Sequence, residues 1–254
     1  MLQLITIPCL KDNYAYLIHD AQSGQTALID VPEAAPILAE LAARGWKLGM
    51  ILLTHHHSDH IQGVAEVVEA TGAVVLGARA DIARLPHLDR ALAEGDRVTI
   101  GGEVGHVLDV SGHTMGHIAF VFPASNLAFT ADSLMAGGCG RLFEGTPATM
   151  WASLGKLAVL PEETRICSGH EYTASNLRFA ATIEPDNAAL ADRINRVTAA
   201  RADGKATVPS LLSEELATNP FLRAGLPQVK AAVGMSGATD LQVFAEIRAR
   251  KDKF

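Results

Sequence analysis

The chain has 254 residues, 48% of them hydrophobic, which suits one large domain or one domain with a small appendage. Its formal net charge of −7 argues against a nucleic-acid partner, and no apolar run reaches the roughly eighteen residues that a membrane span needs. Three scattered cysteines and an N-terminus without a basic leader predict a reduced, cytoplasmic protein.

The first two thirds of the chain predict strands that alternate with helices. A helix over residues 36–44 precedes a buried strand over residues 50–53, which leads into a histidine-rich turn and a second helix that ends near Gly72. Further strands are predicted over residues 2–7, 15–18, 27–29, 73–76, 98–100, 104–110, 118–122, 127–130 and 165–167, and a third helix over residues 148–160.

The pattern changes near residue 173, where the strand signal disappears. Helices are predicted over residues 174–183, 188–200, 213–217 and 239–250, separated by loops that contain proline or glycine. Alternating strands and helices followed by helices alone predict an α/β sandwich with a small helical C-terminal domain. We place the domains at residues 1–173 and 174–254.

The densest group of metal-capable side chains is residues 54–60, Thr-His-His-His-Ser-Asp-His. Because side chains alternate on an extended backbone, His55 and His57 should point the same way and His56 should point away. Asp59 and His60 fall where the next helix begins. The two pairs face differently, so they suit two neighbouring zinc, iron or manganese ions better than one.

A surface loop that is merely rich in histidine is the alternative interpretation of this segment. The agreement of ligand spacing, strand end and helix start argues against it. For His56 alone we expect a structural hydrogen bond.

Three further candidate ligands follow the ends of predicted strands. His113 and His170 each lie three residues beyond a strand, and Asp132 lies two residues beyond another. Taken singly, each could be a turn cap or a satisfied polar residue, but carboxyl ends of strands gather at one edge of a layered α/β fold, where sites form. Asp30, at another strand end, is expected to orient the histidine turn. The remaining histidines are expected to be structural or solvent-facing: His19, His87, His106 and His117.

The histidine segment, the later Gly-His-Thr, the Asp132 segment and Gly-His-Glu-Tyr-Thr resemble the metallo-β-lactamase fold, specifically the glyoxalase II (hydroxyacylglutathione hydrolase) family. The resemblance runs nearly end to end and includes Asp12-Asn13-Tyr14, Gly138-Cys139-Gly140-Arg141, Asn219-Pro220-Phe221 and Lys251-Asp252-Lys253-Phe254. The histidine motif is typical of the whole superfamily. The Gly-Cys-Gly and Gly-His-Glu-Tyr segments with the helical tail narrow the resemblance to this family.

What the resemblance implies is an αββα sandwich with two divalent metal ions, zinc in the first place and iron or manganese as alternatives. One ion would take His55, His57 and His113, the other would take Asp59, His60 and His170, and Asp132 would bridge them.

The implied activity is hydrolysis of S-D-lactoylglutathione to glutathione and D-lactate, the second step of methylglyoxal detoxification, by a hydroxide held at the binuclear site. Asp59 and Asp132 would then be catalytic, because they also orient that hydroxide. The thiolate leaving group needs no strong general acid, and Cys139, between two glycines, is expected to pack rather than to catalyse. The residues that similarity assigns to the glutathione moiety are Arg141, Phe143, Tyr172, Arg248 and Lys251.

This chain departs from the family pattern in the substrate pocket. Relatives often carry Lys and Tyr where it has Arg141 and Phe143; Arg141 keeps the charge, whereas Phe143 lacks the hydroxyl, which predicts weaker substrate binding and unchanged metal chemistry. Arg248 and Lys251 lie three apart on one predicted helix. A solvated basic helix end is the alternative interpretation for these two.

Other functions are compatible with the same fold. A glutathione-persulfide dioxygenase with a single iron belongs to another reaction class, and the seven-residue set and the C-terminus argue against it. The helical tail argues against a lactonase or an RNA-processing nuclease of the same fold, and a bridged metal pair argues against a mere metal-binding module. We therefore expect a cytoplasmic monomer that acts on a small glutathione thioester, without nucleic-acid or membrane partners.

Overall fold

The computed structural model describes residues 1–254, which divide into two compact units. Unit 1 comprises Met1–Asp109 and Thr114–Thr130, and unit 2 comprises Val110–His113 and Ala131–Phe254. This division does not coincide with the domains expected from the sequence, so the boundary at residue 173 stays a prediction.

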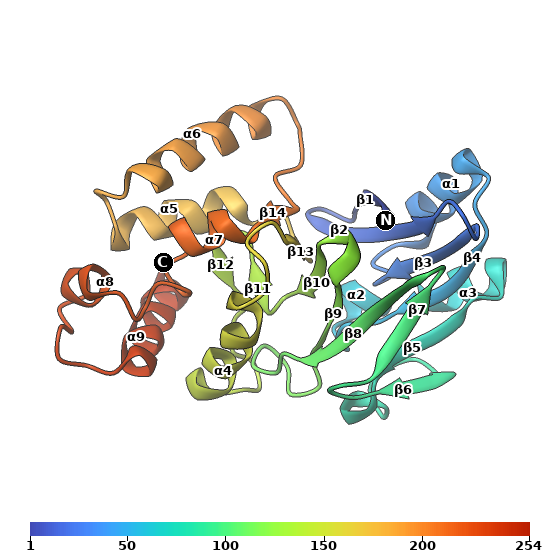
Figure 1. Ribbon diagram of the computed structural model, residues 1–254, viewed down its shortest axis with the longest axis horizontal. Helices are drawn as coiled ribbons and strands as arrows, with labels where there is room; N and C mark the ends of the chain where they lie inside the picture. Colours follow the sequence, from blue (N-terminus) through green and yellow to red (C-terminus); the bar gives the residue numbers. More distant parts are fainter. The chain divides into compact units, whose positions relative to one another are not determined.

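Unit 1 contains a six-stranded sheet in the order β1-β2-β3-β4-β5-β6 (Figure 1). The strands β1 to β3 are antiparallel, and β3 to β6 are parallel. Parallel neighbours need a crossover connection, which helices supply between β3 and β4 and between β4 and β5. The strands span Gln3–Cys9 (β1), Asn13–Asp20 (β2), Gln25–Ile29 (β3), Leu48–Leu52 (β4), Val74–Ala78 (β5) and Arg90–Leu92 (β6).

The crossover helices are α1 (Ala34–Arg44) and α3 (Val64–Thr71), which pack beside each other. The sequence predicted one helix from the histidine turn to Gly72, and this was wrong: a short helix α2 (Ser58–Ile61) precedes α3. The chain breaks at Gly63, where a Cβ would lie 2.9 Å from the Ala34 backbone nitrogen. This close approach requires glycine at the junction between α2 and α3.

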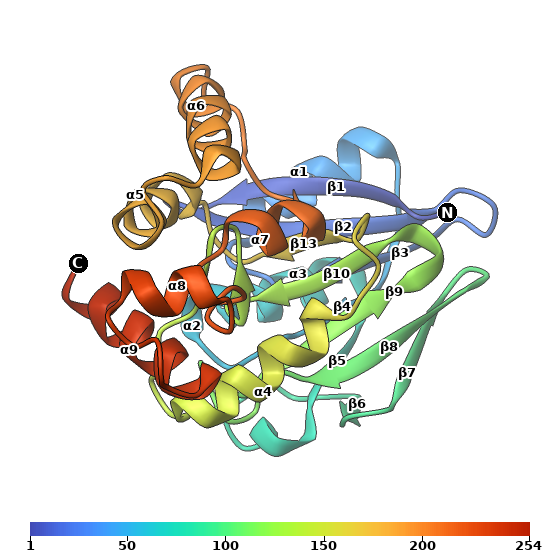
Figure 2. The same ribbon diagram turned by 60° about the vertical axis from the view of Figure 1, so that its left-hand side comes forward.

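Four further strands of unit 1 form an antiparallel series, β7 (Arg97–Ile100), β8 (Glu103–Asp109), β9 (Ile118–Phe122) and β10 (Leu127–Ala131), seen in Figure 2. Tyr16 of β2 and Phe129 of β10 meet with their ring centroids 5.6 Å apart. These two strands belong to different sheets, so the core of unit 1 lies between the sheets. Two 3-10 turns complete the unit, η1 (Arg79–Asp81) and η2 (Pro123–Ser125).

Unit 2 contains a hairpin, a second strand pair and six helices (Figures 1 and 2). The hairpin is β11 (Leu134–Met135) and β12 (Gly138–Cys139), and the pair is β13 (Arg165–Ser168) with β14 (Ser210–Leu211). The helices are α4 (Pro147–Ala158), α5 (Thr173–Ile183), α6 (Ala188–Ala202), α7 (Leu212–Thr218), α8 (Pro227–Ala232) and α9 (Asp240–Lys253).

The helices of unit 2 share an apolar core. Leu177 and Ala180 of α5 pack on Leu190 and Val197 of α6. Phe244 of α9 contacts Trp151 of α4 and Phe221, with centroids 5.5 and 5.8 Å apart. None of the helices combines the length and hydropathy that crossing a membrane would require.

Candidate metal centre

The histidine turn follows β4 in unit 1 and is fixed by backbone hydrogen bonds. Leu53 N–H donates to Leu76 O at 2.8 Å, and Thr54 O accepts from Ile118 N–H at 2.9 Å. The alternation predicted for the three histidines is confirmed. His55 Nε2 lies 3.2 Å from His57 Nδ1, whereas His56 Nδ1 lies 2.8 Å from Asp81 Oδ2. His56 therefore makes the structural hydrogen bond expected of it.

Asp30 supports the turn, as the sequence predicted. Its carboxylate accepts from both the N–H and the hydroxyl of Thr54, and its Oδ2 lies 2.8 Å from His60 Nδ1. A bond at Nδ1 leaves Nε2 as the nitrogen with which His60 could bind a metal ion, and it raises the basicity of the ring. Asp30 is 2% exposed and has a φ of 56°, a left-handed conformation that is rare outside glycine and is often found at functional sites.

Asp59 is held by a residue that the sequence analysis did not single out. Asn13 Nδ2 donates to Asp59 Oδ2 and to Asp59 O, both at 3.0 Å. Asp59 Oδ2 lies 3.8 Å from His60 Nε2. The family resemblance of Asp12-Asn13-Tyr14 is the sequence signal that points to Asn13.

Unit 2 brings together His113, Asp132 and His170. Asp132 Oδ2 lies 3.4 Å from His113 Nε2 and 3.3 Å from His170 Nε2, and all three residues are buried. One carboxylate oxygen between two imidazole nitrogens is the arrangement that a bridging ligand needs. Gly169 N–H donates to Ala131 O at 3.0 Å, which ties the end of β13 to the residue before Asp132.

Glycines allow the close packing around His113. Gly112 has a φ of 148°, a backbone conformation that favours glycine. His113 Nδ1 donates to Arg141 O at 2.8 Å, so Nε2 is the nitrogen with which this ring could bind a metal ion. A Cβ on Gly140 would lie 1.9 Å from Asp132 O and 2.9 Å from His113 Nδ1. The glycine next to Cys139 therefore serves backbone packing, as predicted.

Two exposed aromatic side chains flank these ligands within unit 2. Tyr172 stacks on His170 with centroids 4.6 Å apart, and Phe143 meets the His113 ring edge-on at 5.2 Å. The Arg141 guanidinium lies 5.9 Å from the centre of the Phe143 ring. Three of the predicted substrate residues are thus next to predicted metal ligands.

Arg248 and Lys251 lie on α9 and differ in their surroundings. Arg248 is 6% exposed and donates to Cys139 O at 3.0 Å and to Asp252 Oδ1 at 2.8 Å. Lys251 Nζ lies 3.4 Å from Ser175 O. Burial, together with the nearby Arg248 and Arg178 guanidinium groups, lowers the pKa of Lys251 to about 8. Neither is a freely solvated basic residue at a helix end.

Cys139 is buried, and burial raises the pKa of its thiol to about 11. A thiol that stays protonated at neutral pH is a poor nucleophile. The prediction that Cys139 packs rather than catalyses agrees with this environment.

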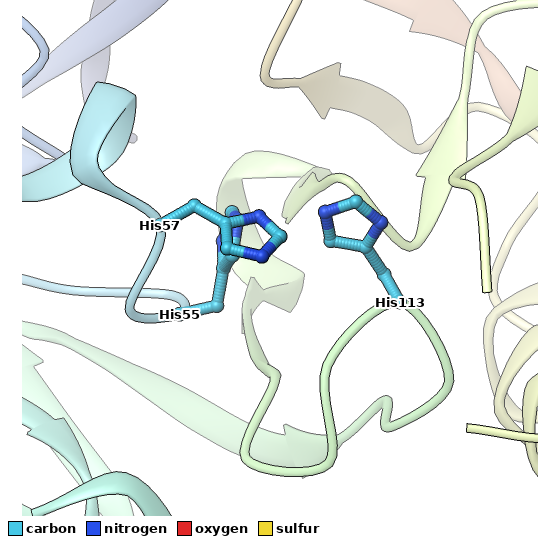
Figure 3. A group of neighbouring side chains, drawn as sticks. All are labelled: His55, His57 and His113. Carbon is cyan, nitrogen blue, oxygen red and sulfur yellow. The ribbon is translucent and has the colours of Figure 1, made fainter. Parts of the chain in front are cut away.

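The donor set fits divalent metal ions. His55, His57 and His113 are one group of neighbouring side chains whose ligand atoms lie within 4.8 Å of one another, drawn in Figure 3, and Asp59, His60 and His170 are another. Imidazole nitrogens and carboxylate oxygens suit zinc, iron and manganese alike.

Residues 11–170 match the model of the metallo-beta-lactamase superfamily, and residues 171–254 match that of the hydroxyacylglutathione hydrolase C-terminus. A hydroxyacylglutathione hydrolase from Cereibacter sphaeroides is 66% identical, and one from Fuscovulum blasticum is 67% identical, each over 100% of this chain and 99% of the relative. Among solved structures, ETHE1 from Myxococcus xanthus superposes with a TM-score of 0.67 at 24% identity, covering 98% of this chain and 90% of that one. TTHA1623 in a di-iron-bound form superposes with a TM-score of 0.56 at 34% identity, covering 66% of this chain and 91% of that one.

The chain has the metallo-β-lactamase fold with a helical C-terminal region, as its sequence predicted. It belongs to the metallo-β-lactamase superfamily and, within it, to the hydroxyacylglutathione hydrolases, which are metal-dependent hydrolases.

Proposed function

We propose that this chain hydrolyses S-D-lactoylglutathione to glutathione and D-lactate. The observation that carries the proposal is the position of Asp132 Oδ2 between His113 and His170, in a chain whose residues 171–254 match the hydroxyacylglutathione hydrolase C-terminus. The full-length identity to relatives of that name supports the same substrate.

The proposal includes two divalent metal ions. When bound, such a pair lowers the pKa of a water molecule toward neutrality and polarises a carbonyl group. We propose zinc, while the di-iron form of TTHA1623 makes iron the first alternative and manganese the second. One ion would be held by His55, His57 and His113, the other by Asp59, His60 and His170, with Asp132 bridging.

The surrounding residues keep these ligands ready to bind. The Asp30 carboxylate and the Arg141 carbonyl each contact an Nδ1 atom, of His60 and His113 respectively, so Nε2 of each ring would be the atom that binds a metal ion. We propose Asp59 and Asp132 as the catalytic residues, because a carboxylate there can accept a hydrogen bond from the attacking water. The thiol of the leaving group has a pKa of about 8.5, so it can depart as a thiolate without a strong general acid.

The glutathione moiety carries one ammonium group and two carboxylates, and the carboxylates favour fixed cations in the pocket. We propose Arg141 and Lys251 as the cations that contact it and Tyr172 and Phe143 as the aromatic surface beside the ligands. Arg248 stays in the proposed set, although it also holds the Cys139 carbonyl. We further propose that residues 174–254 form the glutathione-binding domain and that the enzyme acts as a cytoplasmic monomer.

The test measures metal content by elemental analysis together with cleavage of S-D-lactoylglutathione, before and after chelation. We expect about two metal ions per chain, loss of activity on chelation and recovery when zinc is returned. A chain that holds two metal ions and leaves this thioester intact would contradict the proposal.

The dioxygenase hypothesis gives a different result in a parallel measurement. It requires oxygen uptake with glutathione persulfide and a single iron per chain. We expect no oxygen uptake.

A further inference from the structure

The β11–β12 hairpin of unit 2 connects two parts of the proposed metal centre. It begins two residues after Asp132 and ends two residues before Arg141, whose carbonyl accepts from His113 Nδ1. Gly140 N–H donates to Ser133 O at 3.1 Å and closes the base of the hairpin. A shift of the hairpin would therefore move both the Asp132 carboxylate and the carbonyl that orients His113.

Buried side chains from the helices hold the hairpin through its backbone. They come from α5, from α7 and the residue that follows it, and from α9. Glu215 accepts from Gly137 N–H at 2.8 Å, Asn176 donates to Ala136 O at 3.1 Å, Asn219 donates to Gly138 O at 2.9 Å, and Arg248 donates to Cys139 O at 3.0 Å. Side chains thus satisfy backbone groups that an ordinary surface turn leaves to water.

Glu215 is the centre of this network and is fully buried. Its carboxylate also accepts from Ser210 Oγ at 2.7 Å, from Asn219 Nδ2 at 3.0 Å and from the Arg193 guanidinium. A buried ion pair is costly to desolvate and often adds little net stability, so stability alone is a weak reason for a charged group here. Its bonds do give the hairpin one defined position.

The turn of the hairpin is shaped to meet these side chains. Gly137 has a φ of 69°, and a Cβ on Gly138 would lie 2.7 Å from Asn176 Nδ2. Asn219, also fully buried, donates to Glu215 and to Gly138 O at once. The glycines of the hairpin therefore pack against the helix side chains. We call the four side chains that bond to the hairpin backbone the hairpin clamp (Glu215, Asn219, Asn176 and Arg248).

We propose that Glu215 and Asn219 are positioning residues for the metal centre. Through the hairpin clamp they keep the Asp132 carboxylate between His113 and His170 and keep the Arg141 carbonyl on His113. The helical region then contributes to metal affinity as well as to the proposed glutathione binding. This inference rests on the proposed function, because it takes Asp132 and His113 to be metal ligands.

The experiment compares zinc affinity in the full-length wild type, E215Q and N219A, by competition with a chromophoric chelator. Gln has one acceptor oxygen in place of two, so E215Q cannot satisfy all the donors that surround Glu215. We expect each variant to bind zinc about tenfold more weakly, the lower range found for residues that orient metal ligands.

A matched control separates positioning from general stability. Glu184 is a buried carboxylate in the same helical region, paired with Arg223 at 2.7 and 2.8 Å and without a bond to the hairpin. E184Q should lower the Tm of the metal-free chain and leave zinc affinity unchanged. The metal-free Tm of E215Q and N219A is measured alongside.

The outcomes are distinct for this inference and for the function on which it rests. Wild-type zinc affinity in N219A would overturn the inference even if E215Q failed to fold, because N219A removes only a neutral side chain. An equal loss of affinity in E184Q would also overturn it, since the effect would then follow stability alone. A wild-type chain that binds no zinc would contradict the proposed function instead.

Discussion

His56 and His57 are neighbours in the chain and lie in different surroundings. His57 Nδ1 lies 3.2 Å from His55 Nε2, whereas His56 Nδ1 lies 2.8 Å from the buried Asp81 carboxylate. We expect H57A to lose metal and most of its activity, because it removes a proposed ligand. H56A should keep both and lose about 1–3 kcal/mol of unfolding free energy, since the Asp81 carboxylate loses a partner. Elemental analysis and denaturant unfolding check this pair, and a metal-free H56A would assign His56 a ligand role.

Lys251 gives the proposed substrate site a pH dependence. Its pKa in the folded chain is about 8, below the 10.5 that is usual for a lysine, mainly because burial disfavours the charged amine. The proposed cation is therefore present below about pH 8 and lost above it, so kcat/KM for the anionic thioester should fall as pH rises through this value. The free energy of unfolding should change in the opposite direction to kcat/KM as the pH rises. The folded chain binds fewer protons than the unfolded chain between about pH 8 and 10.5, so stability rises with pH there.

The variant K251R tests the same group, because a guanidinium stays charged throughout this range. Its kcat/KM, corrected for spontaneous thioester hydrolysis, should lose the decline above pH 8. A decline identical to that of the wild type would show that Lys251 is not the group responsible.

At the level of elements, Gly140 allows the end of the β11–β12 hairpin to lie against Asp132 and His113. A Cβ there would lie 1.9 Å from Asp132 O, so G140A must displace the backbone of a proposed ligand. We expect at least a tenfold loss of metal affinity and a loss of about 1–3 kcal/mol in unfolding free energy. Chelator competition and denaturant unfolding measure the two effects.

Gly155 supplies the control for this substitution. It lies within α4, and a Cβ there meets nothing within 4 Å. G155A should raise stability by roughly 0.5–1 kcal/mol, as expected for Ala in place of Gly inside a helix, and leave metal affinity unchanged. Equal metal affinities in G140A and G155A would contradict the role of the hairpin.

Helices and strands of ordinary length were predictable because their pattern of apolar and polar residues repeats often enough to be recognised. The strand predicted over residues 118–122 is β9 itself, and the helix over residues 174–183 differs from α5 by one residue. The sequence predicted no strand beyond residue 173, and this was wrong, because β14 lies at Ser210–Leu211. A strand of two residues is too short to show the alternation that predicts strands. The hairpin strands, the three-residue β6 and the six-residue α8 were missed for the same reason.

In the candidate site, the positions of the proposed ligands were predictable from the sequence and those of the supporting residues were not. Ligand positions could be inferred from strand ends, since those ends converge in this class of fold. The supporting residues Asn13, Asp81 and Glu215 were not predicted, because each bonds a group 25 or more positions away, and no local pattern records such a pairing.

At the scale of the whole molecule, the proposed ligands are spread from His55 to His170 and come together only in the folded chain. Unfolding therefore separates them, and metal that binds the folded state alone adds to stability by mass action. At free zinc about a hundredfold above its dissociation constant, this contribution is about 2.7 kcal/mol per site. A chain of 254 residues shifts its Tm by roughly 2–4 °C per kcal/mol, so removing one such ion should lower the Tm by about 5–10 °C.

The size of this shift should depend on the bridging carboxylate. D132A deprives both proposed ions of a ligand, so chelation should change its Tm by much less than it changes the Tm of the wild type. H56A, which keeps all seven proposed ligands, should show the full wild-type shift. Differential scanning calorimetry with and without chelator measures the three chains. A D132A chain that still shows the wild-type shift would place the metal elsewhere, because this variant lacks the carboxylate oxygen that lies 3.4 Å from His113 Nε2 and 3.3 Å from His170 Nε2.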